Sequence, residues 1–275
     1  MRGLGIPEPR VGAPTPHEVG LMYDLVTPLL NAVAGGPCAI HHGYWADGGA
    51  SSWEDAADRL TDLVARRTPL GPGTRLLDIG CGTGQPVLRI ARDHDIHVTG
   101  ITVSRVQVEL AVEGAHGLRA EFALADAMSL PYADNAFDAA WAVQSLVEMA
   151  EPDRAAREAF RVLEPGGVLV VTDVVTRGAT PAPDERWPTG LRKCAAGEVV
   201  GWLTGAGFEV SSCEDASAGT RYFLPKFASA LAGYRRTIED LYGPHVAEWA
   251  AAVGDHENYA DEMGYVVVTA RKPVG

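Results

Sequence analysis

Apolar positions along the chain follow two periods that alternate from about residue 73 onward. Short unbroken apolar runs, such as 75–79 and 168–175, are typical of strands that are covered on both faces. Stretches with an apolar residue at every third or fourth position lie between these runs and predict amphipathic helices. Strands are expected at 75–79, 96–101, 121–125, 137–142, 168–175, 207–214 and 265–271, and helices at 86–94, 103–114, 152–163 and 197–206. This alternation predicts a parallel α/β sheet with right-handed crossovers.

The segments that flank this core are largely helical in pattern. Residues 17–35 and 221–256 carry apolar side chains at helical spacing, and Ser52 followed by Asp55 predicts the capped start of another helix. The apolar face of helix 17–35 must be buried, so we expect it to cover a pocket and to join copies of the chain in a homo-oligomer. The expected parts are an N-terminal arm and helical lid (1–70), an α/β core (71–217), a helical cap (218–262) and a final core strand (263–275).

The charge of the chain excludes several classes of partner. It has 36 acidic and 23 basic residues among 275, a formal net charge of −13 and no basic run. Nucleic acids and anionic membranes require clustered Lys and Arg, so neither is an expected partner. No stretch approaches 18 consecutive apolar residues, and residues 1–16 lack the apolar run of a secretory signal. The four dispersed cysteines fit a thiol-reducing compartment, so we expect a cytoplasmic protein.

The strongest chemical signal is a glycine-rich turn after the first predicted strand. Asp78 is the next-to-last residue of this strand, and the turn contains Gly80, Cys81, Gly82 and Gly84. Glycine at alternate positions lets the backbone turn sharply and approach a ligand at the carboxyl edge of the sheet. A dinucleotide fingerprint would need glycine where Gln85 stands, and a P-loop would need a GK[ST] sequence, which is absent.

An acid followed by GxGxG resembles motif I of the class I S-adenosylmethionine (SAM) methyltransferases. In that family the loop passes beneath the amino-acid part of SAM, and the acid helps to orient the loop and the ammonium group. The resemblance spans about residues 40–175 and implies a Rossmann-like, doubly wound, seven-stranded sheet with a reversed last strand and a helical cap. It implies that SAM is the cofactor, that 71–217 binds it, and that the adenine lies against Asp126, Ala127 and Met128. Gln144, after the fourth strand, is expected beside the sulfonium.

The second predicted strand departs from the broad family, because it lacks the acid that would hold the ribose hydroxyls. It runs through Thr102 and Ser104 to Gln107 in a stretch that resembles the pattern GIT-x-S-xx-Q. That subgroup includes sterol, cyclopropane-lipid and natural-product methyltransferases, in which Ser, Thr and Gln groups replace the carboxylate. Thr102, Ser104 and Gln107 are therefore cofactor-binding candidates, with a solvated helix position as the alternative for Gln107.

The segment from Ile40 to Trp45, together with the end of the chain from Gly264, resembles a narrower group. It is similar to rebeccamycin-type sugar and macrolactam O-methyltransferases and to teleocidin-type terpenoid C-methyltransferases, which implies a small-molecule acceptor from secondary metabolism. In this group the GYW segment covers SAM, so Tyr44 is a candidate contact of the SAM carboxylate. His41 and His42 are expected to pack under the lid. No metal site is expected, because neither HExxH nor a carboxylate cluster accompanies them.

The residues after the fourth predicted strand are compatible with two types of acceptor atom. The sugar O-methyltransferases carry a histidine pair after the fourth strand, whereas this chain has SLVEM at 145–149. Either Glu148 is the base that activates a sugar, macrolide or macrolactam hydroxyl, or no strong base is needed, as for an alkene that attacks through its π electrons. The catalytic candidates are Glu148, Asp173 and Tyr23. The missing histidine favours carbon methylation of a terpenoid-like metabolite.

Aromatic residues of the cap are candidates for the wall of the acceptor pocket, with ordinary core packing as the alternative for each: Trp187, Trp202, Tyr222, Phe223 and Phe227. The sequence also bears on two other functional classes. Gln85 and the missing acid of the second strand count against a nicotinamide oxidoreductase. A SAM-fold binding protein without catalysis is disfavoured by the intact glycines, although the missing histidine is compatible with it.

Overall fold

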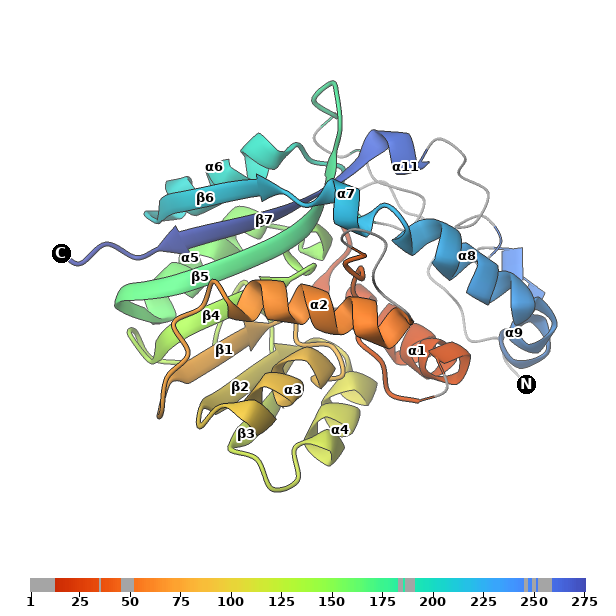
Figure 1. Ribbon diagram of the computed structural model, residues 1–275, viewed down its shortest axis with the longest axis horizontal. Helices are drawn as coiled ribbons and strands as arrows, with labels where there is room; N and C mark the ends of the chain where they lie inside the picture. The colour runs from red at the N-terminus through yellow and green to blue at the C-terminus, as the bar shows by residue number, and fades with distance from the viewer. Residues whose placement is uncertain are drawn as a thin grey trace.

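The computed structural model describes residues 13–34, 36–45, 52–182, 185, 191–244, 247–248, 251 and 259–275. Its centre is a seven-stranded sheet in the order β3-β2-β1-β4-β5-β7-β6 (Figure 1). The strands are β1 Arg75–Ile79, β2 His97–Thr102, β3 Ala120–Leu124, β4 Phe137–Val143, β5 Leu163–Thr176, β6 Glu209–Asp215 and β7 Met263–Arg271. Strands β1 to β5 pair in parallel, whereas β7 is antiparallel to β5 and β6. The predicted doubly wound sheet with a reversed last strand is confirmed.

Helices cover both faces of the sheet, because successive strand residues point to opposite faces and both sets are apolar. One face carries α2 (Trp53–Ala65), α3 (Gln85–Asp93) and α4 (Arg105–Gly114), and the other carries α5 (Pro152–Val162) and α6 (Ala196–Ala206) (Figure 1). Leu60 of α2 shares a core with Trp141 of β4. Leu203 of α6 belongs to the core on the opposite face. Since α2 joins the packing of the sheet, the boundary of the lid at residue 70 stays a prediction.

The start of α2 follows from its sequence. The hydroxyl of Ser52 accepts a hydrogen bond of 3.1 Å from the backbone N–H of Asp55, which satisfies one of the free donors at the helix start. This confirms the capped helix start expected at Ser52.

A helical cap lies beyond the carboxyl edge of the sheet (Figure 1). It consists of α1 (Pro16–Ala34), α8 (Phe223–Gly233) and α9 (Arg235–Tyr242), and the short helices α7 (Ser217–Thr220) and α11 (Tyr259–Glu262) lie where the cap meets β6 and β7. Leu29, Leu231 and Ile238 bring the three longer helices together in a separate small core. The predicted cap is therefore present. Residues 1–12 of the expected arm and Trp187 lie outside the described residues.

The apolar face of α1 is turned toward the interior of the chain, where Leu29 and Leu30 are buried and its other apolar side chains are half-buried. Val19, Met22 and Val26 line two cavities at the carboxyl edge of the sheet, while Leu29 packs on the other cap helices. This burial needs no second copy of the chain, so the homo-oligomer stays a prediction. Among the described residues, no helix is both long enough and apolar enough to cross a membrane.

Candidate functional site

The first of two neighbouring cavities lies at the carboxyl ends of the central strands, where open parallel sheets bind ligands. We call it the glycine-loop cavity. Consecutive strands each contribute residues to it, because their carboxyl ends meet at this edge. Its lining includes Gly80, Gly82, Thr102, Gln107, Asp126, Ala127, Met128 and Gln144, all of them predicted cofactor contacts.

The glycine loop turns tightly because its three glycines adopt left-handed backbone angles. Gly80 has φ 79°, Gly82 has φ 55° and Gly84 has φ 74°. A Cβ on Gly80 would lie 2.5 Å from the Cβ of Ser145, whereas a Cβ on Gly82 would meet no atom within 4 Å. The Gly82 backbone therefore borders open space, as the approach of a ligand to the loop requires.

Three other predicted cofactor residues, Asp78, Cys81 and Gly84, lie in or next to the glycine loop but away from the cavity. Asp78 is the penultimate residue of β1 and has only 2% of its surface exposed, and burial raises the pKa of its carboxyl to about 7. The Cys81 thiol is buried beside Gly100, and Gly84 packs against Phe122 at the start of α3. Among the described residues, these three do not line the glycine-loop cavity. Their contacts with a cofactor stay predictions.

The end of β2 and the first turn of α4 present a hydroxyl and an amide in place of an acid. The Thr102 hydroxyl donates to Gln107 Oε1 at 2.6 Å, and Gln107 Nε2 donates to the Thr27 hydroxyl of α1 at 3.3 Å. Gln107 is 3% exposed, so it is not the solvated helix residue of the alternative interpretation. Both Thr102 and Gln107 line the cavity, where they could exchange hydrogen bonds with a ligand's hydroxyls.

Ser104 has a different place from the one expected. Its hydroxyl accepts from the backbone N–H of Gln107 at 3.1 Å as the N-cap of α4, and it donates to Asp24 of α1 at 2.6 Å. Ser104 is fully buried, and these two hydrogen bonds use its hydroxyl as both donor and acceptor. It is not among the described residues that line either cavity. Ser104 thus positions α1 and α4 around the cavity, and the expected ribose contact does not follow from this geometry.

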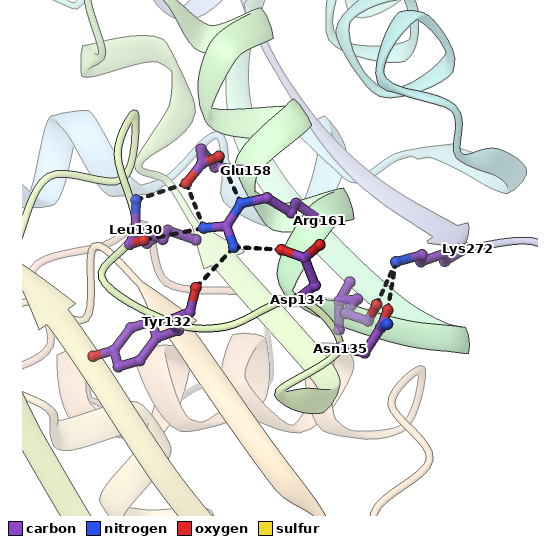
Figure 2. Close-up of polar contacts among 8 residues, drawn as sticks. Leu130, Tyr132, Asp134, Asn135, Glu158, Arg161 and Lys272 are labelled. Carbon is purple, nitrogen blue, oxygen red and sulfur yellow. Dashed lines mark hydrogen bonds and ion pairs between the residues drawn. The ribbon is translucent and has the colours of Figure 1, made fainter.

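The segment after β3 is held in place by Arg161 of α5 (Figure 2). The Arg161 guanidinium donates to the backbone oxygens of Leu130 and Tyr132 at 3.0 and 2.8 Å, and to the carboxylates of Glu158 and Asp134. Leu130 N donates back to Glu158 at 2.8 Å. This network anchors the chain just beyond Asp126, Ala127 and Met128. Asp126 also accepts a bond of 2.8 Å from the backbone N–H of Met128, which shapes the turn.

The second cavity lies between the cap and the sheet edge, and we call it the apolar cavity. Its volume is about 320 Å³. Three of the aromatic residues around it come from α2 and α8: Trp53, Phe223 and Phe227. The two predicted wall residues Trp202 and Tyr222 do not line it among the described residues. Trp202 packs beside the core of α6, and Tyr222 is 36% exposed.

Four residues line both cavities and mark the boundary between them: Tyr23, Ile40, Gln144 and Glu148. The Tyr23 hydroxyl donates to Glu148 Oε1, and burial, with that carboxyl alongside, raises the pKa of Tyr23 well above its usual value. Two of the three catalytic candidates therefore meet at the boundary, as a group that acts on a bound acceptor must.

Asp173, the third catalytic candidate, lies apart from both cavities. Its side chain is fully buried at the end of β5, and its carboxyl accepts from the backbone N–H groups of Val147 and Val174, both at 3.1 Å. Val147 belongs to the short 3₁₀ helix Leu146–Glu148, so Asp173 holds the turn that carries Glu148. This geometry supports a positioning role. Direct contact with the acceptor stays a prediction.

Tyr44 is also displaced from its expected place. Its ring lies against Gly219 of α7, where an added Cβ would come within 2.1 Å of the ring, and its backbone N–H donates to Ala56 at 2.8 Å. Tyr44 does not line the glycine-loop cavity among the described residues. It joins α2 to α7, and its contact with the cofactor stays a prediction.

His42 is a site residue that the sequence interpretation missed. It lines the apolar cavity, stacks on Phe223 with ring centroids 3.9 Å apart, and lies within 2.6 Å (Nδ1) of Gln144 Oε1. Burial lowers the pKa of His42 to about 3, so the ring is neutral. The chain lacks the histidine pair that the resembling sugar O-methyltransferases carry after this strand, but the fold brings a histidine from before α2 into contact with Gln144 at the boundary. The HHGYW segment was the available signal.

Comparison with known proteins agrees with this geometry. A family model for a methyltransferase domain matches residues 77–171. The 27-O-demethylrifamycin SV methyltransferase of Amycolatopsis mediterranei is 40% identical, covering 94% of this chain and 98% of its own. The methyltransferase GfsG of Streptomyces halstedii is 34% identical, covering 94% and 95%. The crystal structure of the [4+2]-cyclase SpnF is 63% identical with a TM-score of 0.92, covering 97% of this chain and all of that one.

Proposed function

Because the chain belongs to the class I SAM-dependent methyltransferases of natural-product biosynthesis, we propose that it methylates a hydroxyl group of an uncharged, largely apolar secondary metabolite bound in the apolar cavity. One observation carries this proposal. The polar end of the apolar cavity offers hydrogen-bond acceptors, namely the Glu148 carboxyl and the His42 imidazole. A substrate hydroxyl is the donor that matches them.

The charge of the apolar cavity supports an uncharged acceptor. Its described lining includes Glu148 but no Lys or Arg. A phosphorylated or carboxylated acceptor would enter without a cationic partner and beside a carboxyl group, which is costly in an apolar environment. The volume of about 320 Å³ lies at the lower end for small-molecule pockets and suits one ring system or a short section of a larger metabolite.

The residues in and around the glycine-loop cavity fit SAM. Gly82 borders open space, while Thr102 and Gln107 offer groups to ribose hydroxyls. Asp78 does not line this cavity, but its buried carboxyl has no cationic partner among the described residues. When bound, SAM supplies a methyl group activated by the sulfonium. The chain's part is to hold the acceptor oxygen in line with that methyl at the boundary between the cavities, which can contribute several kcal/mol through positioning alone.

Glu148 is the residue that would take the proton of the acceptor hydroxyl. It lines both cavities, so a hydroxyl held there could reach its carboxyl. Tyr23 donates to the same carboxyl and, with its raised pKa, stays protonated and keeps that carboxyl oriented. General-base assistance of this kind typically adds roughly 10²–10⁴-fold.

Carbon methylation of a terpenoid-like alkene is a less supported form of the same reaction. The aromatic wall of Trp53, Phe223 and Phe227 suits a developing carbocation. An alkene, however, would leave the buried Nε2 of His42, which has no hydrogen-bond partner among the described residues, without a donor. A buried acceptor without a partner costs binding free energy, so the aromatic wall alone does not outweigh the match to a hydroxyl.

Intramolecular cyclisation is the second candidate function, and one observation favours it. The identity of 63% over 97% of the chain to the [4+2]-cyclase SpnF is higher than the 40% to the rifamycin methyltransferase. A cavity with apolar walls could hold a flexible polyene in a folded conformation and lower the entropic part of the barrier. In this case SAM would stabilise the cavity without giving up its methyl group.

One experiment separates the two functions. The protein is incubated with hydroxylated polyketide and polyene lactone substrates in the presence of SAM or of S-adenosylhomocysteine, and products are analysed by mass spectrometry. Methyl transfer requires SAM, adds the mass of one CH₂ group and creates a methoxy signal by NMR. Cyclisation gives an isomer of unchanged mass with either compound. An isomer as the sole product would overturn the methylation proposal, and a product methylated at carbon would overturn the choice of a hydroxyl.

A further inference from the structure

We propose that Gln144 is a positioning residue that holds His42 in the tautomer with a proton on Nδ1, so that Nε2 is left as a hydrogen-bond acceptor for a hydroxyl in the apolar cavity. The two residues come from distant parts of the chain, 102 positions apart, and meet at the boundary between the cavities. The tautomer follows from geometry alone. The part played by the hydroxyl rests on the proposed function.

The orientation of the Gln144 amide is determined by the backbone of His42. One atom of this amide lies 2.9 Å from the His42 backbone N–H and 2.6 Å from His42 Nδ1. A backbone N–H can only donate, so the amide atom must be the oxygen. An amide oxygen can only accept, and Nδ1 must therefore carry a proton. In a neutral imidazole, Nε2 then has the lone pair.

The His42 Nε2 atom is a buried hydrogen-bond acceptor that has no donor among the described residues. His42 is 3% exposed, and Nε2 is buried without a hydrogen-bond partner among the described residues. Phe223 at 3.9 Å and Tyr265 at 5.2 Å between ring centroids restrict rotation of the imidazole. A buried acceptor of this kind needs a partner, and the apolar cavity that His42 lines is where a ligand could supply one.

The backbone of Gln144 supports the same interpretation. Gln144 has φ 52°, in the left-handed region that residues with a side chain seldom adopt. Its backbone N–H donates to Thr172 at 2.6 Å, which holds the residue directly after β4. Backbone strain of this type persists at functional sites where the strained conformation places a group that is needed. Here it places the side chain against His42.

Nitrogen NMR of protein labelled with ¹⁵N-histidine tests the tautomer without any substrate. The His42 signals are assigned by their absence from His42→Gln. We expect a protonated Nδ1 and an unprotonated Nε2 in the wild-type protein. Gln144→Met, which keeps the length of the side chain but has no acceptor, should shift His42 to the other tautomer or to a mixture. Gln144→Glu retains an acceptor oxygen and should keep the wild-type pattern, and Gln85→Met is the control outside both cavities.

Phenol and toluene then test the acceptor role of Nε2. Phenol should shift the Nε2 resonance in a saturable way in wild-type protein, whereas toluene, which has no hydroxyl, should not. The shift should be lost in Gln144→Met. A wild-type His42 with its proton on Nε2 would overturn the whole inference, even if Gln144→Met failed to fold. A correct tautomer with no response to phenol would overturn the acceptor role. Neither measurement reads methyl transfer, which the incubations with SAM and S-adenosylhomocysteine test directly, so a failure of this inference can be told from a failure of the proposed function.

Discussion

The Asp24 carboxylate of α1 accepts hydrogen bonds from the Ser104 hydroxyl at 2.6 Å and from the Val106 backbone N–H at 3.1 Å. Both donors lie at the start of α4, where free N–H groups and the helix dipole favour a negative charge. Nearby, Gly20 approaches the strand–helix turn so closely that an added Cβ would lie 2.2 Å from Val103 O. Together these contacts fasten α1 beside both cavities.

Replacement of Asp24 should therefore weaken SAM binding without unfolding the core. Asp24→Ala removes the charged partner of α4, and hydrogen bonds to charged groups contribute about 1.5–3 kcal/mol. We expect a loss of SAM affinity up to this range by calorimetry, because α1 supplies Val19 and Tyr23 to the cavity wall. Asp153→Ala, in an exposed ion pair of α5, is the control. Equal affinities for the two variants would contradict the role of Asp24.

The glycine loop gives a matched pair of variants. Gly82→Val should place a side chain in the space that the cofactor occupies and abolish SAM binding. Gly73 also has a left-handed backbone, with φ 81°, and no atom within 4 Å of an added Cβ, but it lies in the loop before β1. Gly73→Val therefore carries similar backbone strain and should bind SAM normally. Loss of binding in both variants would show that strain, not occupied space, is responsible.

Arg161 offers a test of the adenine side of the cavity. Arg161→Lys keeps the charge but cannot bridge Leu130, Tyr132 and Glu158 with one planar group (Figure 2). We expect faster hydrogen exchange in residues 126–135 and weaker SAM binding by about 1 kcal/mol, a typical value for one lost hydrogen bond. Arg157→Lys, on the exposed side of α5, is the control. Unchanged exchange in this segment would show that Arg161 is not needed to anchor it.

The sheet and the glycine loop could be predicted from the sequence because their signals are local. The apolar run of β5 and the alternating glycines after Asp78 each determine a conformation within a few residues, and the structure has both. Helix α2 likewise begins at the Ser52 cap that its sequence indicates. Local propensity and tertiary packing agree at these positions.

The contacts between distant segments could not be predicted in this way. Ser104 has the residue type that the subgroup pattern requires, but its hydroxyl is used by Asp24, 80 positions earlier. His42 approaches Gln144 only because the chain before α2 crosses the sheet edge. No local sequence pattern determines either contact, because each depends on how the cap packs against the core. For this reason the acceptor side of the site was less predictable than the cofactor side.

The last prediction concerns the pH dependence of SAM binding through Asp78. Burial raises the pKa of this carboxyl to about 7, so in the free protein it is protonated at pH 5.5 and increasingly ionised toward pH 7. SAM is cationic and should favour the ionised form, so its affinity should rise with pH across this window while protons are released. The stability of the free protein should change in the opposite direction. An unfolded Asp, with a pKa of about 3.9, has already lost its proton, whereas the folded state retains it, so Asp78 makes stability fall as pH rises from about 4 to about 7.

Calorimetry between pH 5.5 and 7 checks this prediction. In this range the amino group of SAM stays largely protonated, because the ordinary pKa of an α-amino group is about 7.7. Repeating the titration in buffers with different ionisation enthalpies measures the protons released. Asp78→Asn cannot ionise, so it should bind SAM more weakly than wild type near pH 7 and lose both the proton release and most of the pH dependence. Asp62→Asn, at an exposed ion pair of α2, should keep both. If Asp78→Asn retained the wild-type proton release, another group would be responsible and Asp78 would not be the partner of the SAM cation.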